Sequence, residues 1–232
     1  MFKLIGRIIY RLFKVEIRDR RNWRKENKWL LDYNFSTIID IGANEGQFAG
    51  KMRMFFPNAN ISSFEPIHTV YQKLTNNFIS DSLFKAYPYG LGDVEMETAF
   101  NENENSESSS LLKLKDHTAH FDKAVQTKSI TITVKRLDDI LAETQLSKPM
   151  LVKIDVQGFE DKVIAGGKKI LAQADMIICE VSFAQLYEGQ KLFADIFDML
   201  SSLGFTYAGN YEQLHSPANN AALQADAIFV KK

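Results

Sequence analysis

A short apolar segment that ends in an acid and two glycines constrains this chain more than any other feature. Residues 37–48 read T-I-I-D-I-G-A-N-E-G-Q-F. Residues 37–41 are rich in β-branched side chains and residues 47–56 have helical apolar spacing, so the glycines fall where a strand gives way to a helix. Glycine adopts backbone angles that other residues avoid and lets a ligand approach the main chain, as at the ligand crevice of an open α/β sheet. The segment therefore predicts a nucleotide-binding turn.

The glycine spacing favours one class of ligand over another. A dinucleotide fingerprint needs glycine at its first, third and sixth positions, but counting from Gly42 the chain has Asn44 and Gln47 at the third and sixth. A second apolar run, residues 60–64, precedes Glu65, and a carboxylate there can accept both hydroxyl protons of a ribose. The neutral turn suits the amino-acid part of S-adenosylmethionine better than a pyrophosphate. The structural alternative is a buried turn in which Glu65 caps a helix.

The same architecture recurs at residues 150–160, M-L-V-K-I-D-V-Q-G-F-E, where an apolar run again ends in an acid followed by a glycine. Asp155 is expected at the carboxyl end of its strand, because ligands of open α/β sheets bind at that edge. Lys153 lies two residues earlier and shares a face of the strand with it. Charges in so apolar a strand are costly unless they are paired. Both residues are therefore candidates for catalysis, and a structural ion pair or a helix cap is the alternative.

Apolar and amphipathic segments alternate along the rest of the chain. Strands are expected at residues 83–91, 175–181, 205–208 and 225–230, an added antiparallel strand at 95–100, and helices at 66–78 and 192–203. This alternation predicts a mainly parallel sheet with helices on both faces. Residues 101–110, N-E-N-E-N-S-E-S-S-S, lack apolar anchors. Residues 101–128 are therefore expected to form a mobile insertion, either a lid over the substrate or padding.

Composition indicates one α/β domain, residues 36–232, preceded by a basic extension, residues 1–35. With 232 residues, 45% of them hydrophobic, the chain can bury a full core. Residues 1–28 hold ten Lys or Arg against three acids, a net charge of +7, which leaves −8 for the remainder of a chain whose net charge is −1. The acidic body argues against a nucleic-acid partner. The single cysteine, Cys179, excludes an intrachain disulfide and a cysteine-based zinc site, and it indicates a reducing, cytoplasmic setting.

The basic extension has its own pattern. Basic residues recur every three or four positions in residues 1–18, and Leu, Ile and Phe fill the opposite side, so an amphipathic helix is expected. The segment is too charged to span a bilayer and lacks the cleavage pattern of a secretory signal. Two interpretations remain: the helix packs on the domain or a second subunit, or residues 1–20 make a peripheral contact with an anionic membrane.

Over residues 36–230 the chain resembles the FkbM-type methyltransferases, a branch of the class I S-adenosylmethionine-dependent fold. The segments that carry the resemblance are I-I-D-I-G-A-N-E-G-Q-F (38–48), F-E-P (64–66), S-S-L (109–111), L-D-D (137–139), L-V-K-I-D-V-Q-G-F-E (151–160), E-V-S-F (180–183), G-F (204–205) and A-D-A-I-F-V (225–230). It implies a Rossmann-like α/β fold with a mainly parallel seven-stranded sheet whose last strand is antiparallel. It also implies S-adenosylmethionine as cofactor, S-adenosylhomocysteine as product, and methyl transfer to a hydroxyl of a sugar, glycan or natural product. An N- or carboxyl-directed methyltransferase and a nonenzymatic cofactor-binding scaffold are the alternatives.

The resemblance, together with the residue patterns, assigns the site. Candidates for cofactor binding come from the first turn and from the ends of the second and third strands: Asp40, Gly42, Ala43, Asn44, Gly46, Gln47, Glu65, Pro66, Gly92 and Asp93. Asp155 is expected to act as base or to orient the acceptor, with Lys153 tuning it. Residues expected to face the substrate are Gln157, Glu160 and Glu180. No metal is assigned, although Asp155 and Glu180 offer oxygen ligands of the kind that Mg²⁺ binds.

Overall fold

The computed structural model describes residues 27–103, 110–112, 127–142 and 146–232. The chain divides into a short N-terminal unit, residues 1–34, and a main unit, residues 35–232. The described part of the N-terminal unit contains the helical turn α3 (Lys28–Leu31), and the amphipathic helix expected over residues 1–18 lies outside the described residues. Within the described ranges, no helix is both long enough and apolar enough to cross a membrane.

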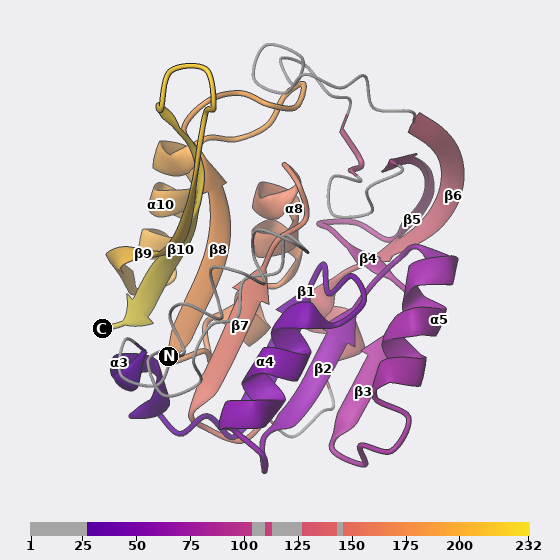
Figure 1. Ribbon diagram of the computed structural model, residues 1–232, viewed down its shortest axis with the longest axis vertical. Coiled ribbons are helices and arrows are strands. Elements are labelled where there is room, and N and C mark those ends of the chain that lie inside the picture. Colours follow the sequence, from indigo (N-terminus) through magenta and orange to yellow (C-terminus); the bar gives the residue numbers. More distant parts are fainter. Residues whose placement is uncertain (1–26, 104–109, 113–126, 143–145) are drawn as a thin grey trace, which may run out of the picture. The chain divides into compact units, whose positions relative to one another are not determined.

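A seven-stranded sheet, counted over the described residues, forms the centre of the main unit (Figure 1). Its order is β3-β2-β1-β7-β8-β10-β9. The strands are β1 (Thr37–Ile41), β2 (Asn60–Phe64), β3 (Phe84–Tyr87), β7 (Met150–Ile154), β8 (Met176–Ser182), β9 (Phe205–His215) and β10 (Ala222–Lys231). The strands from β3 to β8 pair in parallel, whereas β10 is antiparallel to both β8 and β9. The predicted mainly parallel sheet with an antiparallel last strand is confirmed.

The central strands are buried on both faces. Every residue of β1 and of β7 is buried, as expected of parallel strands covered by helices. The helices are α4 (Gln47–Phe55), α5 (His68–Asn77), α7 (Leu137–Ile140), α8 (Glu160–Gly166), α9 (Lys168–Leu171) and α10 (Phe193–Ser202). Side chains of α8, α9 and α10 share one core cluster with Ile39 and Ile41 of β1, while α4 lies in front of the sheet in Figure 1. Burial therefore fixes the strands, and the charged groups of β1 and β7 come near their carboxyl ends.

A second, three-stranded sheet stands beside the main one. It contains β4 (Gly90–Leu91), β5 (Met96–Asn103) and β6 (Thr127–Lys135) in the order β4-β6-β5, with β5 antiparallel to β6. The single strand expected at residues 83–91 is thus wrong, because the chain leaves the main sheet after Tyr87 and β4 pairs with β6. The antiparallel strand near residues 95–100 is confirmed as β5, and β6 was not predicted.

The expected insertion is shorter than residues 101–128. Residues 101–103 continue β5, residues 127 and 128 begin β6, and the backbones of Asn101 and Ser110 are hydrogen-bonded in both directions. Residues 104–109 and 113–126, where the lid was expected, lie outside the described residues.

Candidate active site

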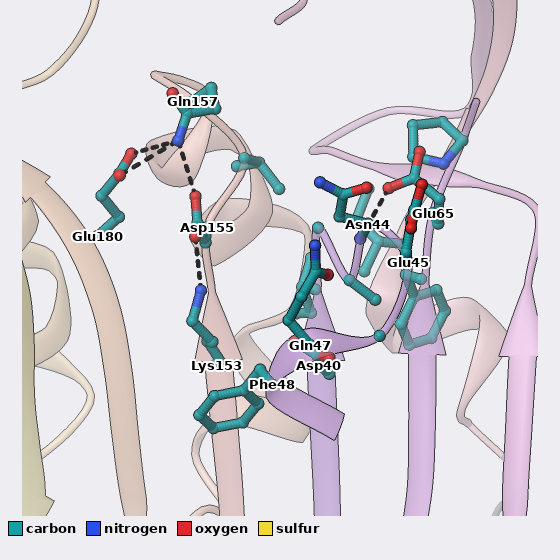
Figure 2. Close-up of a pocket in the computed structure, with 18 of the residues that line it drawn as sticks. Asp40, Asn44, Glu45, Gln47, Phe48, Glu65, Lys153, Asp155, Gln157 and Glu180 are labelled. Carbon is teal, nitrogen blue, oxygen red and sulfur yellow. Dashed lines mark hydrogen bonds and ion pairs between the residues drawn. The ribbon is translucent and has the colours of Figure 1, made fainter. Parts of the chain in front are cut away.

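A cleft of about 1180 Å³ lies at the carboxyl ends of the central strands. Figure 2 shows Glu65 beyond β2 on one side of the cleft, and on the other side Asp155 and Gln157 beyond β7 and Glu180 on β8. Sites for one small ligand usually occupy roughly 300 to 1,000 Å³. The cleft therefore has room for two reactants side by side, at the edge where open α/β sheets bind ligands.

The glycines of the first turn are required by the packing of the protein itself. Gly42 has φ +79°, and a Cβ atom there would lie 1.8 Å from the carbonyl oxygen of Asp155. Gly46 has φ +92°, and a Cβ atom there would meet the side chains of Phe78 and Leu74. The positive φ values confirm the expected need for glycine, and protein atoms fill the side-chain space at both positions. The turn still lines the cleft through Gly42, Ala43, Asn44, Gly46 and Gln47.

Asp40 is a buried carboxylate beneath this turn. Its side chain lines the cleft, yet among the described residues neither carboxylate oxygen has a hydrogen-bond partner. Burial raises its pKa to about 6, with Lys153 lowering it and Asp155 raising it further. The amide of Ala49 lies near enough to lower the pKa slightly without reaching hydrogen-bond geometry. An unbonded buried carboxylate is costly and leaves negative potential under the turn.

Glu65 both supports the turn and faces the cleft. Its Oε2 accepts a hydrogen bond from the Asn44 amide at 3.0 Å, and its Oε1 accepts one from the Ile67 amide at 2.8 Å. Burial raises the pKa of Glu65 to about 7 against the lowering effect of these two amides. The structural and functional interpretations therefore coexist, because each oxygen keeps an acceptor position for a ribose hydroxyl. Pro66 also lines the cleft here.

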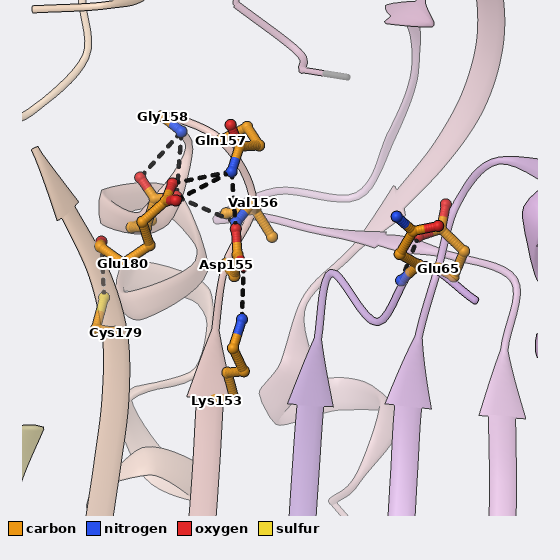
Figure 3. Close-up of polar contacts among 10 residues, drawn as sticks. Glu65, Lys153, Asp155, Val156, Gln157, Gly158, Cys179 and Glu180 are labelled. Carbon is orange, nitrogen blue, oxygen red and sulfur yellow. Dashed lines mark hydrogen bonds and ion pairs between the residues drawn. The ribbon is translucent and has the colours of Figure 1, made fainter. Parts of the chain in front are cut away.

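The opposite wall carries a network of side chains built on β7 (Figure 3). Lys153 Nζ donates to Asp155 Oδ2 at 2.6 Å. Gln157 Nε2 donates to Asp155 Oδ1 at 2.9 Å and to both carboxylate oxygens of Glu180 at 3.2 and 3.0 Å. The hydroxyl of Tyr187 in turn donates to Gln157 Oε1 at 2.8 Å. The structure thus brings together Lys153, Asp155, Gln157 and Glu180, as the sequence predicted.

Asp226 belongs to the same wall and was missed. It pairs directly with Glu180 across the β8–β10 ladder and lines the cleft. Burial raises its pKa to about 6, although Lys153 opposes this shift. Burial also disfavours the charge on Lys153, but Asp155, Asp226 and Asp40 outweigh that effect and raise its pKa. One buried ammonium is therefore surrounded by three carboxylates.

Three sequence-predicted residues take other places. Glu160 is buried and turns toward the backbone, where it accepts hydrogen bonds from the amides of Val156 and Gly158 at 3.1 Å. It holds the turn after β7, so its expected role in facing the substrate is wrong. Gly92 and Asp93 do not line the cleft, because Gly92 packs against the Gly166 position of α8. The residues just before them, Tyr89, Gly90 and Leu91, line it instead.

The polar wall does not resemble a metal centre. Among the described residues, no three His, Cys, Asp or Glu side chains are grouped so as to hold a metal ion. Asp155 and Glu180, the pair considered for Mg²⁺, converge on the amide nitrogen of Gln157. A hydrogen-bond donor thus occupies the position between the two carboxylates where a cation would bind.

Comparison with known proteins places this geometry in a family. The family model of the methyltransferase FkbM domain matches residues 40–207. The chain belongs to the FkbM methyltransferase family. It is 29% identical over 180 residues to the 2-O-methyltransferase NoeI of Sinorhizobium fredii (strain NBRC 101917 / NGR234), which covers 75% of this chain and 74% of that protein. It is 27% identical over 170 residues to the hexuronic acid methyltransferase AglP of Haloferax volcanii, which covers 71% of this chain and 64% of that protein.

Solved structures agree on the fold of this FkbM methyltransferase. The methyltransferase FkbM of Methylobacillus flagellatus KT matches 85% of the chain with a TM-score of 0.51 at 13% identity, and this chain spans 44% of its length. Aeropyrum pernix fibrillarin, solved with natively bound S-adenosyl-L-methionine, matches 86% of the chain and 68% of its own with a TM-score of 0.50 at 10% identity. The protein therefore has the class I S-adenosylmethionine-dependent methyltransferase fold.

The residues of the cleft suit this cofactor. Besides the acids described above, Glu45 and Glu212 line the cleft, while its basic lining residues are Lys51 and Lys153. A cleft in which carboxylates outnumber ammonium groups attracts a sulfonium cation and repels a pyrophosphate. The unbonded Asp40 and the cleft-lining Glu65 supply this negative charge at the end of the cleft formed by β1 and β2.

Proposed function

We propose that this FkbM methyltransferase transfers a methyl group from S-adenosylmethionine to a hydroxyl of a sugar, glycan or natural-product small molecule. The observation that carries the proposal is a single cleft with two different walls. One wall holds Glu65 beside the glycine turn, and the other holds the Lys153–Asp155 ion pair with Gln157 and Glu180. The named activities of the relatives NoeI and AglP, a 2-O-methyltransferase and a hexuronic acid methyltransferase, support a hydroxylated acceptor.

The cofactor would lie over the carboxyl ends of β1 and β2. Glu65 would hold the ribose hydroxyls, the turn from Gly42 to Gln47 would hold the methionine end, and Tyr89 to Leu91 would contact the adenine. When bound, the cofactor supplies a methyl group that is already activated by the positive sulfonium. The chain then has to hold the acceptor oxygen in line with that methyl group.

Positioning is the larger part of this task. Holding two reactants in alignment can lower the barrier by roughly 7 to 11 kcal/mol, whereas a placed base contributes about 10² to 10⁴-fold in rate, or roughly 3 to 5 kcal/mol. Asp155 suits the first role because Lys153 and Gln157 fix both of its oxygens while its side chain stays 28% exposed to the cleft. A fixed carboxylate can accept a hydrogen bond from an acceptor hydroxyl and orient that oxygen.

Titration calorimetry with S-adenosylhomocysteine tests the cofactor site. Wild type is expected to bind, and the Asp40→Ala and Glu65→Ala variants are expected to lose most of the affinity. Exposed Glu188 is outside the cleft, so Glu188→Ala is the matched control and should bind like wild type. Failure of a folded wild-type protein to bind would contradict the proposed cofactor site.

The acceptor class needs a second assay. We would supply p-nitrophenyl hexopyranosides and p-nitrophenyl hexuronides with S-adenosylmethionine and locate the added methyl group by NMR. Methylation at a ring hydroxyl supports the proposal. Transfer to an amine or to the hexuronide carboxylate, with no ether formed, would support the N- or carboxyl-directed alternative instead.

We also propose a cytoplasmic protein whose basic segment, residues 1–20, contacts anionic membranes. The net charge of +7 over residues 1–28 supports the contact, and the buried free thiol of Cys179 supports the compartment. Sedimentation with phosphatidylserine vesicles tests the contact. Deletion of residues 1–20 should abolish co-sedimentation, and unchanged co-sedimentation would contradict it.

A further inference from the structure

The two carboxylates that end β7 and β8 occupy different environments. Asp155 accepts a hydrogen bond on each oxygen, one of them from the ammonium of Lys153 at 2.6 Å. Within the described residues, the carboxylate of Glu180 accepts hydrogen bonds from the neutral amide of Gln157 alone. The cation therefore stabilises the charge on Asp155 directly, while Glu180 lacks a bonded cation although both acids line the same cleft.

We propose that Glu180 receives the proton of the acceptor hydroxyl, while Asp155 remains the ion-paired carboxylate that orients the acceptor. This division of roles rests on the O-methyltransferase function proposed above. It extends that proposal, which gave Asp155 the positioning role and named no base, and it follows from which of the two acids the lysine contacts.

The surroundings of Glu180 favour its taking up a proton. Charged and titratable groups face it from every element packed around it: Lys153 on β7, Asp155 just after β7, Glu160 on α8, Asp226 on β10, and Tyr187 in the loop after β8. Burial, followed by Asp155 and Glu160, raises the pKa of Glu180 well above its usual value, and Lys153 only partly opposes this. Glu180 is half-buried. A carboxylate in such surroundings gains more from accepting a proton than one that is bonded to an ammonium.

Gln157 connects the two acids, because its amide nitrogen donates hydrogen bonds to both Asp155 and Glu180. It adopts φ +55°, a backbone conformation that non-glycine residues rarely take. Ser110 Oγ donates to its carbonyl oxygen at 2.5 Å, and the hydroxyl of Tyr187 donates to its side-chain oxygen at 2.8 Å. These two contacts direct the amide NH₂ group toward both carboxylates. Gln157, Tyr187 and Ser110 are therefore positioning residues, since they act through Glu180 and Asp155.

The proton balance of the step is simple. As the acceptor oxygen bonds to the methyl carbon, the carbon–sulfur bond breaks and its electron pair goes to sulfur, which becomes a neutral thioether. The hydroxyl proton goes to Glu180, which becomes a neutral carboxylic acid. Neutralising Glu180 removes its repulsion with Asp155 and Asp226, so proton transfer relieves a crowded group of charges. The proton later returns to water.

Carboxyl NMR of protein labelled with [5-¹³C]glutamate tests the inference without an acceptor. Several glutamate resonances should titrate above the usual range, including those of Glu65 and Glu160. We expect one further such resonance that is absent from Glu180→Gln and retained in Glu188→Gln, because Glu188 is exposed and outside the cleft. If the resonance lost in Glu180→Gln titrates in the usual range for glutamate, the inference is overturned. This result is independent of whether S-adenosylhomocysteine binds or a hydroxyl is methylated, so the two proposals fail separately.

Kinetics on whichever p-nitrophenyl glycoside wild type methylates supply the second test. Glu180→Gln should lower kcat by about 10² to 10⁴-fold and remove the acidic limb of the pH profile, while its affinity for S-adenosylhomocysteine stays within threefold of wild type. Asp155→Asn should keep the acidic limb and mainly raise KM for the acceptor. A kcat for Glu180→Gln within threefold of wild type, or loss of the acidic limb in Asp155→Asn instead, would overturn the assignment.

Tyr187→Phe examines the positioning role. It removes the hydroxyl that orients Gln157, so kcat should fall about 3- to 10-fold, the loss of one hydrogen bond, and the acidic limb should shift. If Tyr187 has a purely structural role, Tyr187→Phe will lower the stability of the protein and leave the pH of the acidic limb unchanged. That outcome would contradict the proposed network.

Discussion

Replacing Asp40 by Asn should make the protein more stable at alkaline pH. The carboxylate of Asp40 is 1% exposed and unbonded, and burial raises its pKa from 3.8 to about 6. Each pKa unit corresponds to about 1.36 kcal/mol, so the ionised group costs roughly 3 kcal/mol of folding free energy at pH 8. Because the folded pKa is the raised one, this cost is absent below pH 3.8 and grows as the pH rises through about 6. Asn cannot ionise, so Asp40→Asn does not carry this free-energy cost.

The assay is urea unfolding of wild type and Asp40→Asn at several pH values between 4 and 8. Any fixed cost of the Asn amide is the same at every pH, so the informative quantity is how the stability difference changes. That difference should move in favour of Asp40→Asn by about 2 to 3 kcal/mol from pH 4 to pH 8. Lys153 keeps Asp155 and Asp226 as partners in the variant. A difference that stays constant over this range would refute the reasoning.

Three further predictions concern the same cleft. Gly42→Ala should lower the urea-unfolding free energy by about 2 to 4 kcal/mol through strain and the clash at 1.8 Å, whereas Gly189→Ala, with φ +75° and open space around it, should cost only about 1 to 2 kcal/mol; equal losses would contradict the contact. Below pH 7, the affinity of wild type for S-adenosylhomocysteine should fall up to tenfold per unit in calorimetry as Glu65 protonates, and Glu65→Gln should lack this dependence. Lys153→Met should destabilise the protein by about 3 kcal/mol in urea unfolding, and adding Asp155→Asn should recover part of the loss; no recovery would argue against the ion pair.

The sequence predicted the first two strands of the main sheet. Residues 37–41 and 60–64 were placed within the observed bounds of β1 and β2, because β1 is buried along its whole length and β2 buries Ile61 and Phe64, as expected of strands covered by helices. The strand β6 was missed although Ile130, Ile132 and Val134 alternate with polar residues in it, a period-two pattern that could have revealed it. The boundary between β3 and β4 could not be predicted, because it depends on pairing with that missed strand.

Some residues of the candidate site were predicted from the sequence and others were not. Asp40, Glu65 and Asp155 were placed correctly at strand ends, since acids that follow apolar runs must emerge at the edge of the sheet. Asp226 was overlooked although it stands alone among apolar residues in A-D-A-I-F-V, the same signal that singled out Asp155. The direction of Glu160 could not be inferred, because it depends on a turn in which consecutive residues have φ values of +55° and +98°.

The contact between Gly42 and the carbonyl of Asp155 couples the two halves of the cleft. The Asp155 amide also donates to the carbonyl of Ile41 at 3.0 Å, and Asp40 is in register with Lys153 across the β1–β7 ladder. Main-chain atoms therefore set the spacing between the wall that would hold the methyl donor and the wall that would hold its recipient. The cleft side chains of β9, Tyr211 and Glu212, can then be exchanged to suit a different recipient while the path of the methyl group keeps its length.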